Sequence, residues 1–355
     1  MGAQTAPALQ AKDDGLAFFL ANWAGADIGR GALARCIGAM AQAGGEIARL
    51  VAAESLAGQL GADVGQTNQD GDDQKRLDLI ADRMILDALR KTPVAFYASE
   101  ESEAILTLDP QGALAVACDP IDGSANIELN LAIATIFAVF PVAAEGATAS
   151  FLRRGADQVA AGYILYGPHT ALILTLGSGV AQFILDPAAN AFRRSGGDLS
   201  PPAATLVFAI NASNYRHWPD PIRDFIDECV RGGNGPKGKD FNMRWLACVA
   251  AEAHRILRRG GVYLYPSDRR KGYENGRLRL LYEAFPIAFL IEQAGGAATD
   301  GVARLLDKTT ASLHQRSALV FGSTELVARV AACFKGAQAK TESAPPSGQR
   351  GLLQN

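Results

Sequence analysis

Cysteine and histidine are scarce in this sequence, and neither is spaced for binding a metal. The 355 residues include five cysteines and four histidines. No C-x-x-C pair occurs, which excludes a zinc ribbon and a disulfide framework. Isolated cysteines are typical of a protein in a reducing compartment, so we expect a cytoplasmic protein. The cysteines are Cys36, Cys118, Cys229, Cys248 and Cys333.

The sequence also lacks an excess of one charge and long apolar runs. Its formal net charge is −3, which gives no reason to expect nucleic acid or an anionic membrane as a partner. The longest apolar run, 131–144, is shorter than a membrane span and contains Thr135. No signal-peptide pattern is visible. Basic residues cluster only around 269–271 and 277–279, which suits a small anion.

Hydrophobic periodicity alternates between that of helices and that of strands in both halves of the chain. It predicts helices at 32–57, 77–89, 221–231, 244–258 and 283–293. Strands are predicted at 94–99, 114–118, 135–140, 161–167, 171–176, 205–211 and 261–266. We therefore predict an α/β or α+β fold of layered helices and sheets.

A boundary between two domains is indicated by the segment SGGDLSPPAA, residues 195–204, which is rich in turn formers. We predict an N-terminal domain over 13–198 and a C-terminal, substrate-binding domain over 199–336. Residues 1–12 and 337–355 are small, polar or contain proline and glycine, and we expect disordered tails there.

Carboxylates stand where predicted core elements end. Two follow the strand at 94–99, two follow the strand at 114–118, and one begins the helix at 283–293, because Pro286 suits a first turn. A fourth segment, GDDQKRLD, has one acid in a glycine-containing loop and one at a helix start. The acids are Glu100, Glu101, Asp119, Asp122, Glu283, Asp72 and Asp78.

Buried charges at strand ends need compensation, and hard divalent cations supply it. Mg²⁺ prefers oxygen ligands, and two such ions can activate a water and stabilise a leaving oxygen. The carbonyl of Ile121 is a further candidate ligand, and the N–H groups of Gly123 and Ser124 form a candidate phosphate cradle. The alternatives for each acidic segment taken alone are an ordinary turn or a solvated loop.

Several long segments together resemble class 1 fructose-1,6-bisphosphatase, within the lithium-sensitive sugar phosphatase superfamily. They include SEE, DPIDGSANIELNLAIATIF, AGYILYGPHTALILTLGSGV, GRLRLLYEAFPIAFLIEQAGG and HQRSALVFGS. Inositol monophosphatases share little beyond the DPIDG element. The resemblance covers roughly residues 16–335 and implies a two-domain fold of stacked helix and sheet layers.

The resemblance also implies an activity and a set of site residues. The activity is hydrolysis of the C1 phosphate of fructose 1,6-bisphosphate with two or three Mg²⁺ or Mn²⁺ ions. Glu101 and Asp78 would position and deprotonate the attacking water, with Asp72 supporting the loop. The implied metal ligands are Glu100, Asp119, the Ile121 carbonyl, Asp122 and Glu283. Asp122, Gly123 and Ser124 would also contact the reacting phosphate.

A second set of residues is implied for the distal phosphate, the one that does not react. It comprises Asn211, Tyr215, Arg244, Tyr265 and Arg277. Arg244 would reach a neighbouring subunit, which implies a homo-oligomer, usually a tetramer, with shared sites. Arg277 stands where the family usually has lysine, and Trp245 where it usually has tyrosine; Cys248 replaces a usual serine.

Three other functions stay open at this stage. One is a dual fructose- and sedoheptulose-bisphosphatase. Both of its substrates carry two phosphates on a sugar chain of similar length, so the sequence does not show which sugar is preferred. An inositol-monophosphatase-like enzyme and an inactive sugar-phosphate sensor are the others, although a sensor would be expected to have lost acids that are present here. The sequence does not distinguish gluconeogenesis from the Calvin cycle.

AMP inhibits many members of the family. We predict that this enzyme is insensitive to AMP, or is controlled by a different effector at a remodelled site. The hydroxyl and cationic residues that would hold the adenylate phosphate are replaced at Ala113, Leu114 and Pro141, and the helix turn reads DIGRGALA. Losing two charge-assisted hydrogen bonds weakens binding by at least about a hundredfold. Turnover measured across an AMP titration checks this, and inhibition below millimolar AMP would contradict it.

Overall fold

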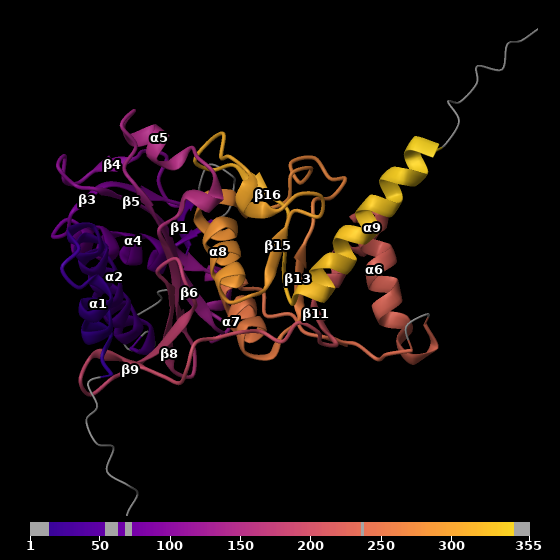
Figure 1. Ribbon diagram of the computed structural model, residues 1–355, viewed down its shortest axis with the longest axis horizontal. Helices are drawn as coiled ribbons and strands as arrows, with labels where there is room; N and C mark the ends of the chain where they lie inside the picture. Colours follow the sequence, from indigo (N-terminus) through magenta and orange to yellow (C-terminus); the bar gives the residue numbers. More distant parts are fainter. Residues whose placement is uncertain (1–13, 54–62, 68–72, 236–237, 344–355) are drawn as a thin grey trace, which may run out of the picture. The chain divides into compact units, whose positions relative to one another are not determined.

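The computed structural model describes residues 14–53, 63–67, 73–235 and 238–343. The chain divides into two compact units. Unit 1 comprises residues 1–151 and 158–198, and unit 2 comprises 152–157 and 199–355. The predicted tail at 1–12 lies outside the described residues. Each unit has its own sheet and its own covering helices (Figure 1).

Unit 1 is built on an eight-stranded sheet. All neighbouring strands are antiparallel except β3 and β5, which are parallel. The five strands predicted between residues 94 and 176 are present. In order across the sheet the strands are β10 (Ala191–Arg194), β9 (Ala181–Asp186), β8 (Thr170–Thr175), β7 (Ala160–Tyr166), β6 (Ile133–Pro141), β5 (Leu114–Asp122), β3 (Val94–Ser99) and β4 (Leu106–Thr107).

Among the described residues, the long helices that pack on this sheet are α1 (Leu16–Ala24), α2 (Ile28–Ala52) and α4 (Arg76–Leu89). α2 contacts β7 and β8, α4 contacts β3 and β5, and α1 contacts β10. Their buried aliphatic side chains form one core with the inward residues of the strands. The remaining elements are β1 (Asp63–Thr67), β2 (Asp73–Lys75) and α5 (Ala147–Phe151). The predicted helix at 32–57 begins earlier, at Ile28, and its residues 54–57 lie outside the described part of the chain.

Unit 2 contains a mixed five-stranded sheet. β11 is parallel to β12 and to the central strand β13, and β17 is antiparallel to β13 and β15. The order is β12 (Asn242–Met243), β11 (Val207–Ala209), β13 (Val262–Tyr265), β17 (Leu319–Gly322) and β15 (Ala297–Thr299). A separate short pair joins β14 (Leu278–Arg279) to β16 (Arg316–Ser317).

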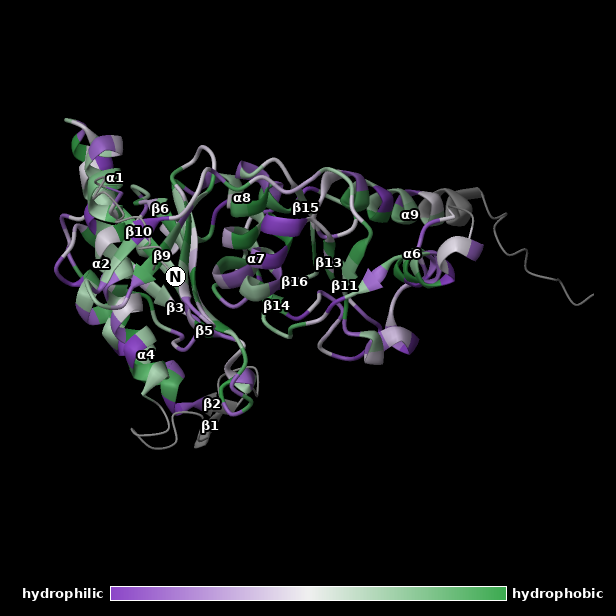
Figure 2. Cartoon of the chain, turned by 90° about the horizontal axis from the view of Figure 1, so that it is seen from below, coloured by the Kyte–Doolittle hydropathy of each residue, from purple (hydrophilic) through white to green (hydrophobic). Residues whose placement is uncertain are grey.

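Helices pack on both faces of the sheet of unit 2. On one face α6 (Asp220–Arg231) and α9 (Thr324–Ser343) share a core with Val262 and Leu264 of β13. α6 is amphipathic and carries hydrophilic residues on its other side (Figure 2). α7 (Val249–Arg259) and α8 (Phe285–Gln293) contact β17 but contribute nothing to that core. In the described part of the chain, no helix is long and apolar enough to span a membrane.

Other predicted boundaries also differ from those in the structure. Arg244 is not helical: α7 begins at Val249, because Ala247 has a positive φ of 54° and Cys248 is extended. A π-helical turn, Leu280–Ala284, precedes α8, so Glu283 lies on that turn and Pro286 in the first turn of α8. α9 continues to Ser343, so residues 337–343 are helical where a tail was expected.

Candidate active site

The end of β5 contains a β-bulge that brings two carboxylates to one side of the sheet. Asp119 pairs with Ile136 and Asp122 pairs with Ala134, so three steps along β5 match two along β6. Residues three apart in a regular strand face opposite sides, but one extra residue restores the same side. Oxygens of Asp119 and Asp122 lie within 4.8 Å of each other, and both side chains are buried.

The bulge is held by a buried hydroxyl pair that sequence reasoning missed. Thr135 Oγ1 donates to the carbonyl of Pro120 at 2.7 Å and lies 2.8 Å from the hydroxyl of Tyr166. Proline has no N–H for the ladder, which favours irregular pairing at this position. The Ile121 N–H donates to Asp119 Oδ1 at 3.0 Å and fixes that carboxylate. The only sequence signal was a threonine inside an apolar run.

Glu100 and Glu101 follow β3, the parallel neighbour of β5. Ser99, the last residue of β3, pairs with Cys118, and the Glu100 N–H donates to the Cys118 carbonyl at 3.0 Å. The Glu101 N–H donates to Ser99 Oγ at 3.2 Å. Because parallel strands end at the same edge of a sheet, both glutamates lie at the edge that carries Asp119. The grouping of these residues as metal ligands and catalytic acids stays a prediction.

Asp78 lies buried in the first turn of α4. Its Oδ2 accepts a hydrogen bond from the Lys75 N–H at 2.8 Å. Its Oδ1 is buried and has no hydrogen-bond partner among the described residues. Burial, and next the negative charge of Glu101, raise the pKa of Asp78 to about 7. Such a carboxyl is suited to accept a proton near neutral pH. Asp72 lies outside the described residues.

A turn with a left-handed glycine follows Asp122. Gly123 has φ 78° and ψ 32°, a conformation that other residues rarely adopt. The first hydrogen bonds of this turn are donated by the N–H groups of Asn126 and Ile127. The N–H groups of Gly123 and Ser124 come before them and donate none of these turn hydrogen bonds, which is the arrangement of backbone concavities that bind anions in other proteins.

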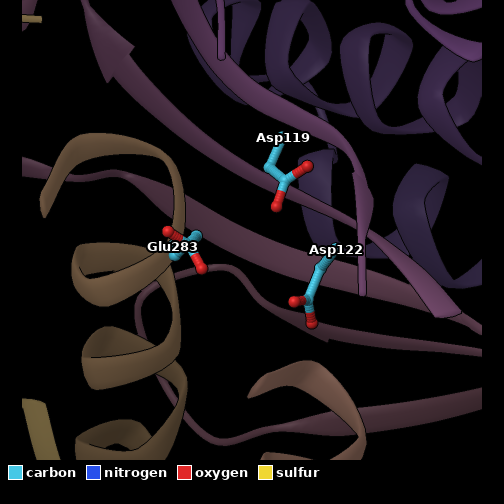
Figure 3. A group of neighbouring side chains, drawn as sticks. All are labelled: Asp119, Asp122 and Glu283. Carbon is cyan, nitrogen blue, oxygen red and sulfur yellow. The ribbon is translucent and has the colours of Figure 1, made fainter. Parts of the chain in front are cut away.

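Unit 2 carries the fifth predicted metal ligand. Glu283 is buried on the π-helical turn before α8, and its Oε2 accepts a hydrogen bond from the Arg279 N–H at 2.6 Å. Single π-turns occur frequently at functional sites. Figure 3 draws the carboxyl groups of Glu283, Asp119 and Asp122.

A small cavity in unit 2 is lined by Asn211, Asn214, Tyr265 and Asp268, among others. Tyr215 is not among its lining residues: its hydroxyl donates to Asp227 of α6 at 2.8 Å, on the exposed surface. Asn214, which was not among the residues predicted from the sequence, does line this cavity. Asn211 caps the 3₁₀ turn Ala212–His217 and Asn214 lies within that turn, three residues further along the chain.

Two arginines predicted for the distal phosphate also belong to unit 2. Burial raises the pKa of Tyr265, and the guanidinium of Arg277 opposes this rise through its charge and a side-chain hydrogen bond. Arg244 is exposed directly after β12, and its Nη1 donates to the Met243 carbonyl at 2.9 Å. Trp245 stacks on Tyr263 with ring centroids 5.7 Å apart.

Buried Asp119 and Asp122 at the end of β5, half-buried Glu100 and Glu101 after the parallel strand β3, and a left-handed glycine turn are features expected of a phosphatase that works with hard divalent cations. Comparison with family models agrees with this class. Residues 18–196 match the N-terminal domain of fructose-1-6-bisphosphatase, and residues 201–335 match its C-terminal domain. The chain belongs to the fructose-1,6-bisphosphatase family. It is therefore a phosphoric monoester hydrolase.

Individual relatives support this membership. The class 1 fructose-1,6-bisphosphatase of Paracoccus denitrificans is 54% identical over 315 residues, covering 89% of this chain and 93% of the relative. That of Rhodopseudomonas palustris HaA2 is 49% identical over 329 residues, covering 93% and 95%. The crystal structure of the holo form of the Leishmania major enzyme matches with a TM-score of 0.84 at 30% identity, covering 90% of this chain and 98% of that one.

We predict that Asp78→Asn stabilises the metal-free protein at high pH. A carboxyl whose pKa rises on folding favours the folded state below its ordinary pKa of 3.8, and this contribution is lost as the pH rises through about 7. Asparagine does not ionise, so the variant's advantage should grow by about 2–3 kcal/mol between pH 5 and pH 8. Urea unfolding of wild type and variant, both in the presence of a chelator, measures the difference in unfolding free energy across that pH range. A difference that does not depend on pH would contradict the raised pKa of Asp78.

Proposed function

We propose that the protein hydrolyses the C1 phosphate of fructose 1,6-bisphosphate to fructose 6-phosphate and phosphate, with a divalent cation. The observation that carries the proposal is the bulged end of β5, where Asp119 and Asp122 are buried on the same side of the strand. Two buried like charges this close are costly unless a cation compensates them. Family membership supplies the sugar bisphosphate as substrate.

The donor set fits Mg²⁺, with Mn²⁺ as the alternative, and two or three ions per site. Every candidate ligand offers oxygen, and neither cysteine nor histidine is among them, which favours a hard cation. The proposed ligands are Glu100, Asp119, the Ile121 carbonyl, Asp122 and Glu283. When bound, the cations would stabilise charge on the phosphate and lower the pKa of a water.

The chain's own residues have three tasks in this reaction. The N–H groups of Gly123 and Ser124 would hold oxygens of the reacting phosphate, since a left-handed glycine turn exposes them. Asp78 and Glu101 would orient the attacking water and take its proton. Asp78 is suited to this because its pKa of about 7 makes it a stronger base than an ordinary carboxylate.

The distal phosphate would be held by residues of unit 2. Asn211, Asn214 and Tyr265 line one cavity there, and Arg277 contacts Tyr265. An arginine fork suits a phosphate because it can donate two parallel hydrogen bonds. We keep Tyr215 outside this group because its hydroxyl is engaged by Asp227.

Arg244 would serve the distal phosphate of a neighbouring subunit in a homotetramer. Two observations support an interface here: Arg244 is exposed, and Met243 and Leu246 beside it are exposed apolar side chains. Exposed apolar residues around a charged one are typical of a surface that another chain covers. A small-molecule enzyme of this kind needs neither nucleic acid nor a membrane.

We predict that Asp122→Asn lowers kcat by about a thousandfold or more. The change removes a charge that offsets the cation, at a cost of several kcal/mol in transition-state stabilisation. Phosphate release from fructose 1,6-bisphosphate measures the effect, and EDTA should abolish wild-type turnover until Mg²⁺ or Mn²⁺ is restored.

Asp87→Asn is the matched control, because it makes the same change at an exposed position of α4 and should keep wild-type turnover. Circular dichroism would verify that both variants are folded. A folded Asp122→Asn enzyme with near-wild-type turnover would show that the metal assignment is wrong.

Arg244→Ala should raise KM about tenfold or more and change kcat little, because a charge-assisted hydrogen bond to a non-reacting group is lost. If sites are shared, mixed oligomers of Arg244→Ala with Asp122→Asn contain sites with both intact residues. Coexpressed chains, purified as hybrids, should therefore regain measurable activity at low substrate. Hybrids no more active than the separate variants would mean that each site is built within one chain.

A further inference from the structure

The loop between β13 and β14, residues 266–277, contains an aromatic ring that touches two cations. The guanidinium carbon of Arg270 lies 4.4 Å from the centroid of the Tyr273 ring, and that of Arg277 lies 4.9 Å from it. Tyr273 is half-buried. Tyr273 is not among the residues proposed above to bind the metal ions or the substrate.

The loop is ordered by its own hydrogen bonds. The Asp268 N–H donates to the Tyr273 carbonyl at 3.0 Å, and the Tyr273 N–H donates to the Arg270 carbonyl at 3.0 Å. The Gly276 N–H donates to the Tyr273 carbonyl at 2.9 Å. Tyr273 is therefore at the centre of the loop's backbone contacts, and its ring has a defined position.

The backbone beside Arg277 is fixed as well. Gly276 has a φ of +95°, and a Cβ there would lie 2.3 Å from the Ala318 nitrogen, so only glycine fits. β14, whose first residue follows Arg277, pairs with β16. What stays undetermined by the backbone is the direction of the long Arg277 side chain.

Each of the two arginines that touch Tyr273 has a further contact in unit 2. Arg270 Nε donates to both carboxylate oxygens of Asp268, at 3.1 and 3.0 Å, and this pairing lowers the pKa of Asp268 against the effect of its burial. Arg277 contacts Tyr265, which lines the cavity with Asn211 and Asn214.

We propose that Tyr273 is a positioning residue that holds the guanidinium of Arg277 over its ring and so orients the arginine fork toward the distal phosphate of a sugar bisphosphate. This inference rests on the proposed function. It explains why arginine stands at a position where the family usually has lysine: a planar guanidinium stacks on an aromatic face and donates two hydrogen bonds in one plane, whereas an ammonium does neither.

The test uses Tyr273→Leu, which removes the ring, and Tyr273→Phe, which keeps it. The full-length enzyme is titrated calorimetrically with fructose 6-phosphate, which retains only the distal phosphate. Tyr273→Leu should weaken its binding and raise KM for the bisphosphate about five- to tenfold, with kcat within twofold of wild type. Tyr273→Phe should behave as wild type in both measurements. Lys271→Ala is the matched control for an exposed cation of the same loop.

A double-mutant cycle with Arg277→Lys separates positioning from general loosening of the loop. In the Arg277→Lys background, Tyr273→Leu should change the affinity for fructose 6-phosphate less than twofold, because the group it orients is gone. An equal loss in both backgrounds would overturn the inference, as would wild-type affinity of the single Tyr273→Leu variant. A failed proposed function is recognised separately, because wild-type enzyme would then not release phosphate.

Discussion

One extra residue in β5 determines the chemistry of unit 1. Without the bulge, Asp119 and Asp122 would face opposite sides of the sheet, and only one could reach a shared ligand. The hydroxyl of Thr135 holds the displaced Pro120 carbonyl, and Tyr166 contacts that hydroxyl from the next strand. A bulge buried in the middle of a sheet needs such substitutes because its backbone groups lose their ladder partners.

Without a countercharge, the buried carboxylates at and near the bulge lower the stability of the folded protein. Asp78, Asp119 and Asp122 are all at least nine-tenths buried, and burial together with the negative charge of Glu101 raises the pKa of Asp78. A protein selected only for stability would replace such groups with apolar ones. Their presence at the end of a core strand is understandable if a divalent cation provides the missing countercharge, which also links metal binding to stability.

The sequence predicts the fold class and much of the site for identifiable reasons. β3, β5 and β6 are long, apolar and bounded by acids or turns, so both the strands and the carboxylates at their ends are recognisable. The N-terminus of α7 was placed too early because the positive φ of Ala247 has no signature in a non-glycine residue. Short strands such as β15 leave too few residues for a period to be seen.

The sequence pattern does not predict the direction in which each side chain of the proposed site points. Tyr215 and Asn214 are adjacent in sequence, yet one contacts Asp227 on the surface and the other lines the cavity with Tyr265. The proposed site residues of unit 1 and those of unit 2 are ordered in different ways. Around Asp122 the geometry is set by backbone pairing, the bulge and a left-handed glycine. Around Arg277 the backbone fixes the position of Cα but not the direction of the flexible side chain, which we infer depends on contact with the Tyr273 ring. Backbone order suits the reacting phosphate, where small displacements cost rate, and a stacked arginine suits a group that needs only to be held.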